Sequence, residues 1–384
     1  MAVAWVGDGI LSVMAFSFST LFSKESKSVL GVDIGTSSIK IVQLRKDHGR
    51  VVLETYGAIA LGPYANTDIG RSTSLPADKI SEALKDVMRE ANVTTTDAGI
   101  SIPYASSLIS IFSLPASAEK QLASIVPIEA RKYIPVPINE VMLDWFVIGD
   151  NAETKSDKIE VMLVAIHNDT IAKFRSIASD AALTVSFFEI EVFSAVRAAI
   201  DRGIAPIAVI DIGAASTKFY VVERGIIHES HIISHGSQDL TLAASRALGV
   251  TVAQAEERKR KYGLTGQPSI SAGGESANVT QGIAELHKSL ELSISPLVSE
   301  LSRTVTAYQT RTNQLLTALV FTGGGATLKG FKEFVESKIQ SEIRLADPFN
   351  KTQAPAFLEA ILKEAGPEFC VAVGLALRRL QEIE

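Results

Sequence analysis

Two stretches of the chain repeat the same alternation of hydrophobic and polar residues. Residues 29–44 read VLGVDIGTSSIKIVQL, and residues 208–222 read AVIDIGAASTKFYVV. Both contain D-I-G-x-x-S-x-K, which places Asp33 and Asp211 at equivalent positions. In each, an apolar run ends in Asp, turns through Gly and small residues, and resumes as a second alternating run, which predicts a β-hairpin. Two such hairpins indicate two similar halves.

Helical spacing marks other parts of the chain. Apolar residues recur at i, i+3 and i+4 over residues 80–88 and 294–308, and we interpret both stripes as core-facing. Residues 321–327 (FTGGGAT) follow the apolar run 318–321 and precede a helical pattern over 328–335. This order predicts a strand, a glycine loop and a helix.

The segment between the hairpins has a rhythm of its own, which predicts a small α+β insertion. Its predicted strands are residues 108–114, 141–148 and 159–166, and its predicted helices are residues 119–133, kinked at Pro127, and 170–183. After the second hairpin, residues 238–262 are predicted to be mostly helical. Residues 263–281, rich in Gly, Ser and Thr, are predicted to be a loop.

Composition narrows the class of protein. The chain has 384 residues, 46% of them hydrophobic and 21% charged, which is ample for globular cores. Its net charge of −6 provides no basic field, so we expect no nucleic-acid partner. A single cysteine, Cys370, excludes an internal disulfide, and six scattered histidines show no zinc spacing. A reducing, cytosolic compartment is therefore expected.

The mean hydropathy of +0.21 is high for a soluble protein, and the N-terminus contributes to it. Residues 9–23 form an uncharged, Phe-rich run that is too short for a transmembrane helix. The first lysine, Lys24, follows this run, so the basic region of a secretory signal is missing. Two interpretations remain open, a floppy tail or a weak membrane contact through Phe16, Phe18, Leu21 and Phe22.

The repeated turns predict a phosphate site. Glycine permits close backbone approach, N–H groups point inward, and hydroxyls complete the shell around a phosphate chain. A hydrated Mg²⁺ on the phosphates needs nearby carboxylates, which Asp33 and Asp211 supply at the mouths of the turns. Lys40 either neutralises phosphate charge or points to solvent. The candidate phosphate-binding residues are Gly35, Thr36, Ser37, Ser38, Gly213 and Ala214.

Together these motifs resemble the actin, Hsp70 and sugar-kinase ATPase superfamily and, more narrowly, the PilM family of type IV pilus assembly proteins. The resemblance covers residues 21–379, including EARKYIP at 129–135, LDW at 143–145 and VGLALR at 373–378. It implies a protein of the α/β class. Its fold would be the duplicated actin-like ATPase (RNase H-like) fold with an FtsA/PilM-type inserted α+β subdomain. Residues 373–378 resemble the second connecting helix, where Gly374 is expected to permit close helix packing.

The resemblance also implies a division of the chain. An N-terminal tail would cover 1–27, subdomain 1A would combine 28–105, 184–203 and 346–384, and the inserted subdomain 1C would be 106–183. Subdomain 2A would combine 204–235 and 300–345, and subdomain 2B would be 236–299.

For the site, the resemblance implies ATP and Mg²⁺, with the first turn on one face of ATP and the second on the other. Gly323, Gly324 and Gly325 would lie against the adenosine. Glu256 and Lys259 match a helix that touches ribose and adenine, and their i, i+3 spacing places them on one helix face. As a charge run alone, this segment would be a solvated helix face.

Hydrolysis needs a carboxylate or amide that orients a water. Residues 187–195 resemble the first connecting helix, in which Glu191 matches a water-orienting Glu. We therefore name Glu191 and Asp211 as candidate catalytic residues. In the alternative interpretation, Glu191 only stabilises the start of a helix. The sequence leaves open whether ATP is turned over.

The implied function is an ATP-binding scaffold on the cytoplasmic face of the inner membrane, holding the N-terminal cytoplasmic peptide of PilN between subdomains 1A and 1C. Residues 129–135 are a candidate wall of that groove or part of the core. Membrane association would come mainly through PilN, with other pilus platform and motor proteins and self-association as further contacts. The alternatives are an FtsA-like division filament protein and a small-molecule kinase of the same superfamily.

Overall fold

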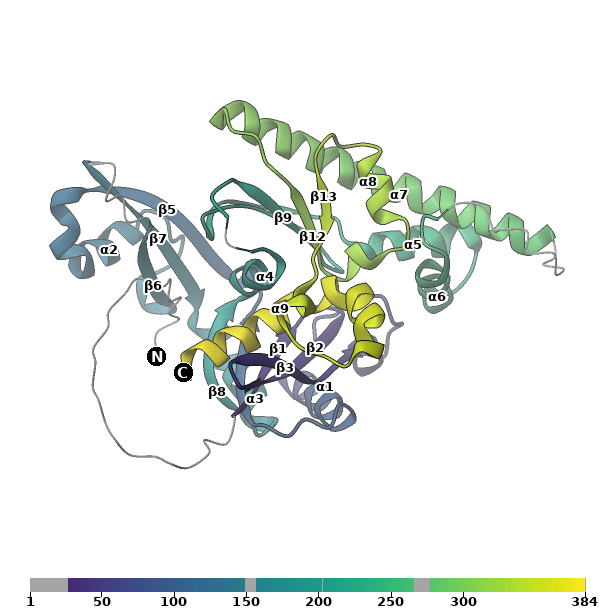
Figure 1. Ribbon diagram of the computed structural model, residues 1–384, viewed down its shortest axis with the longest axis horizontal. Coiled ribbons are helices and arrows are strands. Elements are labelled where there is room, and N and C mark those ends of the chain that lie inside the picture. The colour runs from purple at the N-terminus through teal and green to yellow at the C-terminus, as the bar shows by residue number, and fades with distance from the viewer. Residues whose placement is uncertain (1–26, 149–156, 202, 266–276, 384) are drawn as a thin grey trace.

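The computed structural model describes residues 27–148, 157–201, 203–265 and 277–383 (Figure 1). The interpretations of the N-terminal run 9–23 lie outside the described residues, as does most of the predicted loop 263–281. No helix in the described ranges is both long and apolar enough to cross a bilayer.

Two five-stranded sheets share one topology, which confirms the two similar halves predicted from the repeated hairpin. In each, three antiparallel strands are followed by two parallel ones. The first sheet has the order β3 (Arg50–Ala60), β2 (Ser38–Asp47), β1 (Ser28–Ile34), β4 (Asp97–Ile102) and β8 (Thr184–Ile190). The second has the order β11 (Ile226–Ile233), β10 (Thr217–Glu223), β9 (Ile207–Ile212), β12 (Leu319–Thr322) and β13 (Ile343–Leu345).

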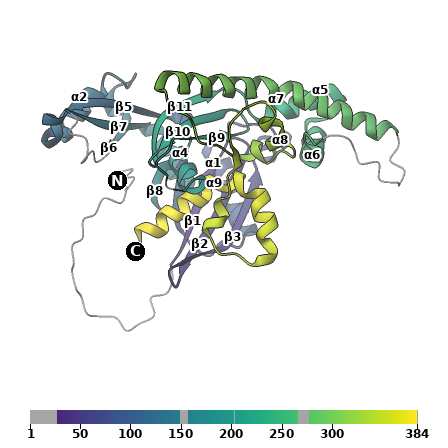
Figure 2. The same ribbon diagram turned by 45° about the horizontal axis from the view of Figure 1, so that its top comes forward.

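Helices cover both sheets and lie between them. The outer face of the first sheet packs on α1 (Ala77–Glu90) and α3 (Asn168–Asp180). The outer face of the second packs on α5 (Ser237–Leu248), α7 (Ala277–Thr312) and α8 (Phe331–Glu336), and Figure 2 shows α7 lying along it. Between the sheets lie α4 (Glu191–Ala199) and α9 (Glu359–Glu382). A further helix, α6 (Val252–Tyr262), follows α5.

The period of two along each hairpin decides which side chains face the other half. In β9, Ala208, Ile210 and Ile212 belong to the outer core, so the side chain of Asp211 points to the inner face. In β1, Leu30 and Val32 pack against the outer helices, so Asp33 likewise faces inward. The same alternation that builds the two cores therefore aims both aspartates at the space between the halves.

The inserted segment contains the three-stranded antiparallel sheet β5 (Ser107–Pro115), β7 (Lys158–His167) and β6 (Val141–Ile148), which confirms its predicted strands. One face packs on α2 (Leu122–Ala130), which contains Pro127. The helix ends three residues earlier than predicted, because residues 131–133 form turns. Ile134 is buried on this side of the sheet, and Tyr133 stacks on Phe112.

The loop predicted for residues 263–281 was wrong at its C-terminal end. The predicted loop 263–281 includes the first turn of α7, which begins at Ala277 and continues unbroken to Thr312. Leu286 and Leu290 are buried against the second half, and this packing stabilises the helix beyond what its local Ser- and Thr-rich sequence favours.

The two helices between the sheets are tied closely together. A Cβ at Gly374 of α9 would collide with the carbonyl of Ser194 in α4, so the close packing expected at Gly374 is confirmed. Beside this contact, the buried carboxylate of Glu189 accepts hydrogen bonds from Arg197 at 2.7 Å and Arg378 at 2.9 Å. These bonds connect α4 and α9 through the end of β8.

Candidate functional site

The two hairpin turns have the same backbone geometry. The N–H of Gly35 donates to the carbonyl of Ser38 at 3.1 Å, and the N–H of Gly213 donates to that of Ser216 at 3.0 Å. A Cβ on either glycine would lie within 3.1 Å of the same carbonyl oxygen that closes its turn. Glycine is therefore what lets each turn close tightly, as the sequence pattern predicts.

The turns face each other across two connected cavities. The larger, of about 580 Å³, is lined from the first turn by Ser37 and Ser38 and from the second by Gly213 and Ala214. The smaller, of about 120 Å³, holds the carboxylates. Every site residue predicted from the sequence lines one of the two. They are Asp33, Gly35, Thr36, Ser37, Ser38, Lys40, Glu191, Asp211, Gly213, Ala214, Glu256, Lys259, Gly323, Gly324 and Gly325.

Four carboxylates line the smaller cavity, those of Asp33, Glu191, Asp211 and Glu368. Asp33 is buried and accepts a hydrogen bond from the hydroxyl of Ser101 at 2.9 Å. Burial raises the pKa of Asp33 despite the nearby charge of Lys40. Lys40 is mostly buried and pairs with Glu368 at 3.9 Å, so of its two predicted orientations it faces the cavity and not the solvent.

Glu191 and Asp211 lie on either side of one lysine. The Nζ atom of Lys218 is 2.8 Å from Asp211 Oδ2 and 3.0 Å from Glu191 Oε2. The other oxygen of Glu191 accepts the backbone N–H of Tyr104 at 2.8 Å. Burial raises the pKa of Glu191, whereas for Lys218 the attraction of the two carboxylates outweighs burial and raises the pKa. Glu191 begins α4, so its position also fits the helix-start interpretation.

The predicted glycine loop follows β12 and packs against the second turn. Gly323 has a φ of +84°, which favours glycine, and a Cβ there would collide with Asp211 and the carbonyl of Ile212. Its N–H donates to the carbonyl of Pro367 in α9 at 2.7 Å. The loop is thus fixed between the second glycine turn and α9.

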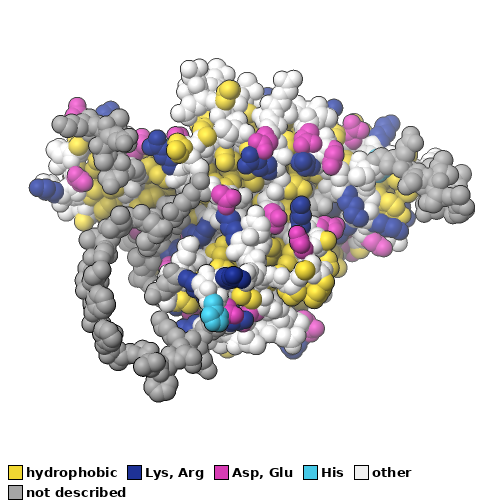
Figure 3. All heavy atoms as spheres, in the orientation of Figure 1, with side chains coloured by type: hydrophobic (Ala, Val, Ile, Leu, Met, Phe, Trp, Pro, Cys, Tyr) yellow, Lys and Arg dark blue, Asp and Glu magenta, His cyan; other side chains and the backbone are white. Residues whose placement is uncertain are grey.

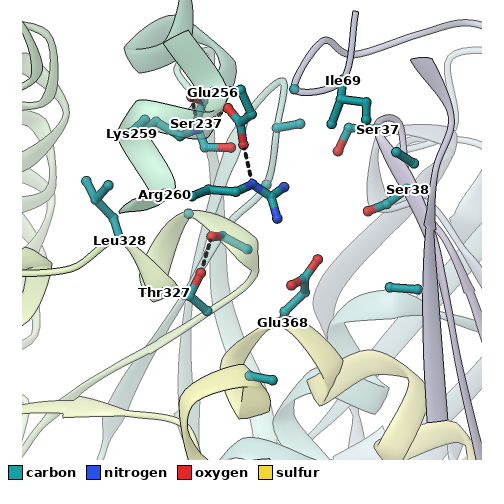
Figure 4. Close-up of a pocket in the computed structure, with 18 of the residues that line it drawn as sticks. Ser37, Ser38, Ile69, Ser237, Glu256, Lys259, Arg260, Thr327, Leu328 and Glu368 are labelled. Carbon is teal, nitrogen blue, oxygen red and sulfur yellow. Dashed lines mark hydrogen bonds and ion pairs between the residues drawn. The ribbon is translucent and has the colours of Figure 1, made fainter. Parts of the chain in front are cut away.

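Helix α6 forms one wall of the larger cavity (Figure 4). Glu256 and Lys259 are buried and paired at 2.6 Å, and both bond the hydroxyl of Thr241. They are therefore not a solvated face. Burial by itself would raise the pKa of Glu256, but the neighbouring charge of Lys259 outweighs it and the pKa is lowered. In Figure 4, Arg260 extends into the cavity from its bond with Glu256, opposite Ser37 and Ser38.

A short segment of the first half closes over the same cavity. The backbone of Thr73 donates to the carbonyl of Thr36 at 2.8 Å, and the backbone of Ser72 donates to the side chain of Gln238 in α5 at 3.1 Å. Gly70 lies against the carboxylate of Glu256 and has a φ of +92°. Residues 70–73 therefore connect the first glycine turn to the helices of the second half.

The residues present fit a nucleotide with its magnesium. The larger cavity is of the size that holds small ligands, and the glycine turns leave space that a Cβ would fill. In the described part of the chain, no three His, Cys, Asp or Glu residues gather closely enough to hold a metal alone. Magnesium typically uses one or two carboxylates together with phosphate oxygens and waters, and Asp33 and Asp211 fit that requirement.

Sequence reasoning missed several lining residues, among them the charged residues Lys218, Arg260 and Glu368. Lys218 is the last residue of the repeated D-I-G-x-x-S-x-K pattern, and its match to Lys40 was a usable signal. Arg260 lies four residues after Glu256, a spacing that predicts a pair on one helix face. Glu368 lines both cavities from α9, and no local pattern marks it, because only the tertiary fold brings α9 to the site.

Comparisons with known proteins agree on the fold. The family model of the cell division protein FtsA matches residues 208–374. The cell division protein FtsA of Bacillus subtilis (strain 168) is 20% identical over 363 residues, spanning 83% of this chain and 78% of that protein.

Solved structures give the same result. A PilM-PilN type IV pilus biogenesis complex matches with a TM-score of 0.74 at 22% identity, covering 92% of this chain and 98% of that one. The ethanolamine utilization protein EutJ from Carboxydothermus hydrogenoformans matches with a TM-score of 0.52 at 16% identity, over 91% of this chain and 89% of that one. MreB5 of Spiroplasma citri bound to ADP matches with a TM-score of 0.51 at 13% identity, over 93% and 98%.

These likenesses confirm the duplicated actin-like fold expected from the sequence. The family model described as "Type IV pilus assembly protein PilM" matches residues 31–271, well over half of the chain. The chain therefore belongs to the PilM family of actin-like ATPases that act in type IV pilus assembly.

Proposed function

We propose that this protein is an ATP-binding scaffold of the type IV pilus assembly platform, held at the cytoplasmic face of the inner membrane. One observation carries the nucleotide part of the proposal. Two glycine turns with the same N–H to carbonyl bond face each other across one cavity and bring carboxylates with them. Membership of the PilM family favours this function over a division filament or a metabolic kinase.

In this proposal, the backbone N–H groups and hydroxyls of the two turns bind the phosphates from opposite sides. Asp33 and Asp211 hold the hydrated Mg²⁺, whose charge offsets that of the phosphates. The glycine loop 323–325 lies against adenosine, with Glu256 and Lys259 near the ribose. Glu191 and Asp211 are the candidate catalytic residues for a slow ATPase activity.

The binding of Mg·ATP by purified protein, measured by calorimetry, tests this proposal. Replacing Asp211 with Ala removes a metal-binding carboxylate and is expected to weaken Mg·ATP binding about tenfold or more. Asp201→Ala is the matched control, because that side chain is 89% exposed and its partner in the described part of the chain is Lys351, away from the cavity. Equal affinities for the two variants, or no binding by the unaltered protein, would contradict the assignment.

The second part of the proposal concerns the PilN peptide. A match to a PilM-PilN complex structure supports it, together with an apolar surface on the inserted sheet. Along β7, Val161, Leu163 and Ala165 pack toward α2, whereas Met162, Val164 and Ile166 face the opposite side. On that opposite face most of the apolar side chains that flank β7 are only partly buried, namely Ile109, Ile111, Met142 and Phe146, whereas Ile148 at the end of β6 is buried.

We define this opposite face of the inserted sheet as the open face. It is continuous with the core of the first half, so it borders the region between subdomains 1A and 1C where the peptide is expected. The alternative wall, residues 129–135, packs on the α2 side instead, where Ile134 belongs to the core. The open face offers apolar side chains to a peptide. In addition, β5 and β6 are the edge strands of this sheet, so an extended peptide can pair alongside one of them.

A binding assay with the first dozen or so residues of a PilN protein tests the peptide site. Ile111→Glu places a charge on the open face and is expected to abolish binding while leaving Mg·ATP affinity unchanged. Ile128→Glu on α2 is the matched control, because that side chain is 65% exposed on the other side. If Ile128→Glu abolishes binding and Ile111→Glu does not, the open face is the wrong site.

A further inference from the structure

The cavity between the phosphate turns already contains a cation that belongs to the chain. Lys218 has a side chain only 14% exposed, and its ammonium contacts Asp211 at 2.8 Å and Glu191 at 3.0 Å. The same ammonium lies 3.9 Å from where a Cβ of Gly213 would be, so it sits directly against the second phosphate turn. Lys218 is therefore inside the site and not at its rim.

The duplicated hairpin provides an internal comparison. Lys40 pairs across its hairpin with Asp33, and Lys218 pairs with Asp211 at the equivalent register. The two lysines nevertheless differ, because Lys40 reaches Glu368 at 3.9 Å whereas Lys218 contacts the carboxylate opposite it. Facing strands permit both arrangements. Asp211 and Glu191 hold Lys218 between them at hydrogen-bond distance, whereas Lys40 meets Glu368 at the longer distance of 3.9 Å.

The charges around Lys218 show what this contact does. Asp211 is one of the two aspartates that fit magnesium, and its Oδ2 atom is engaged by the ammonium. Both oxygens of Glu191 are engaged as well, one by Lys218 and one by the backbone N–H of Tyr104. A carboxylate whose two oxygens both accept hydrogen bonds, one of them from a cation, is held in place and has less acceptor capacity left for orienting a water.

From this geometry we propose that Lys218 is a built-in counter-ion of the phosphate site, which supplies part of the positive charge that magnesium otherwise provides and restrains Glu191. This inference rests on the proposed nucleotide binding. Two consequences follow. First, the affinity for nucleotide depends less on magnesium in this protein than in a variant that lacks Lys218. Second, the site favours retention of bound nucleotide over its hydrolysis.

The test compares ATP affinity in Mg²⁺ with ATP affinity in EDTA, using a fluorescent ATP analogue. Lys218→Met removes the ammonium, so the ratio of the two affinities is expected to rise by about tenfold or more over that of the unaltered protein. Lys218→Arg keeps a cation and is expected to stay near the original ratio. An unchanged ratio in Lys218→Met would overturn the inference.

A second readout needs no nucleotide. In Lys218→Met, Asp211 and Glu191 face each other without a cation, so added Mg²⁺ is expected to raise the melting temperature of this variant more than that of the unaltered protein. If the single variant does not fold, the double variant Glu191→Gln/Lys218→Met removes one of the two negative charges that then face each other. The same affinity ratio can be measured in this double variant. If that ratio matches the unaltered protein, the inference also fails. Absence of ATP binding by the unaltered protein is a different result and contradicts the proposed function itself.

Discussion

Gly374 permits a sharp test of how the two halves are joined. It lies in α9 where a Cβ would collide with the carbonyl oxygen and carbon of Ser194 in α4. A backbone group cannot rotate away as the end of a flexible side chain can, so Gly374→Ala forces α4 and α9 apart. The substitution therefore disturbs the contact that holds the helices between the two sheets.

The expected magnitude follows from two opposed effects. Overpacking a closely packed contact costs about 1–3 kcal/mol, and a backbone collision belongs at the upper end of that range. Alanine in place of glycine inside a helix returns about 1 kcal/mol of helix propensity. We expect Gly374→Ala to lower the free energy of unfolding by about 2 kcal/mol.

Gly282 in α7 is the matched control. Among the described residues, and leaving aside the backbone of its own helix, no heavy atom lies within 4 Å of where its Cβ would be, so Gly282→Ala is expected to stabilise the protein by up to about 1 kcal/mol. Urea denaturation followed by far-ultraviolet circular dichroism measures both variants, and the two are expected to differ by about 3 kcal/mol. If Gly374→Ala is as stable as Gly282→Ala, the close approach of α4 and α9 is not a constraint.

The buried cluster between α4 and α9 and the single cysteine support three further predictions. Glu189→Gln leaves Arg197 and Arg378 without their shared carboxylate and is expected to cost about 3–5 kcal/mol, measured by urea denaturation. The arginines hold the pKa of Glu189 below its ordinary value of 4.5 although burial opposes this, so its stabilisation is present above pH 4.5 and is lost as the pH falls through the lowered pKa. The melting temperature should therefore fall on acidification below pH 4.5, and more steeply in the unaltered protein than in Glu189→Gln. Burial raises the pKa of the Cys370 thiol to about 12, so this thiol is expected to resist a disulfide reagent at pH 8 until urea unfolds the chain; rapid labelling of the native protein would contradict that burial.

The repeated hairpin could be read from the sequence because its signals are local. Alternation, a glycine turn and a fixed spacing to Asp33 and Asp211 all lie within a few residues of one another. The outer cores and the inward direction of both aspartates follow from the period of two. The start of α7 was missed because local composition predicts a loop there, whereas the helix is stabilised further along by the packing of Leu286 and Leu290 against the second half.

The sequence by itself therefore determined that there are two similar halves, and it located both glycine turns and the glycine loop. Only the tertiary structure decided how the charges inside the cavity are paired. Lys40 and Lys218 hold the same place in the repeat, yet one meets Glu368 from α9 and the other meets Glu191 from α4. Those partners come from distant parts of the chain, and periodicity carries no information about contacts that arise only when the halves pack together.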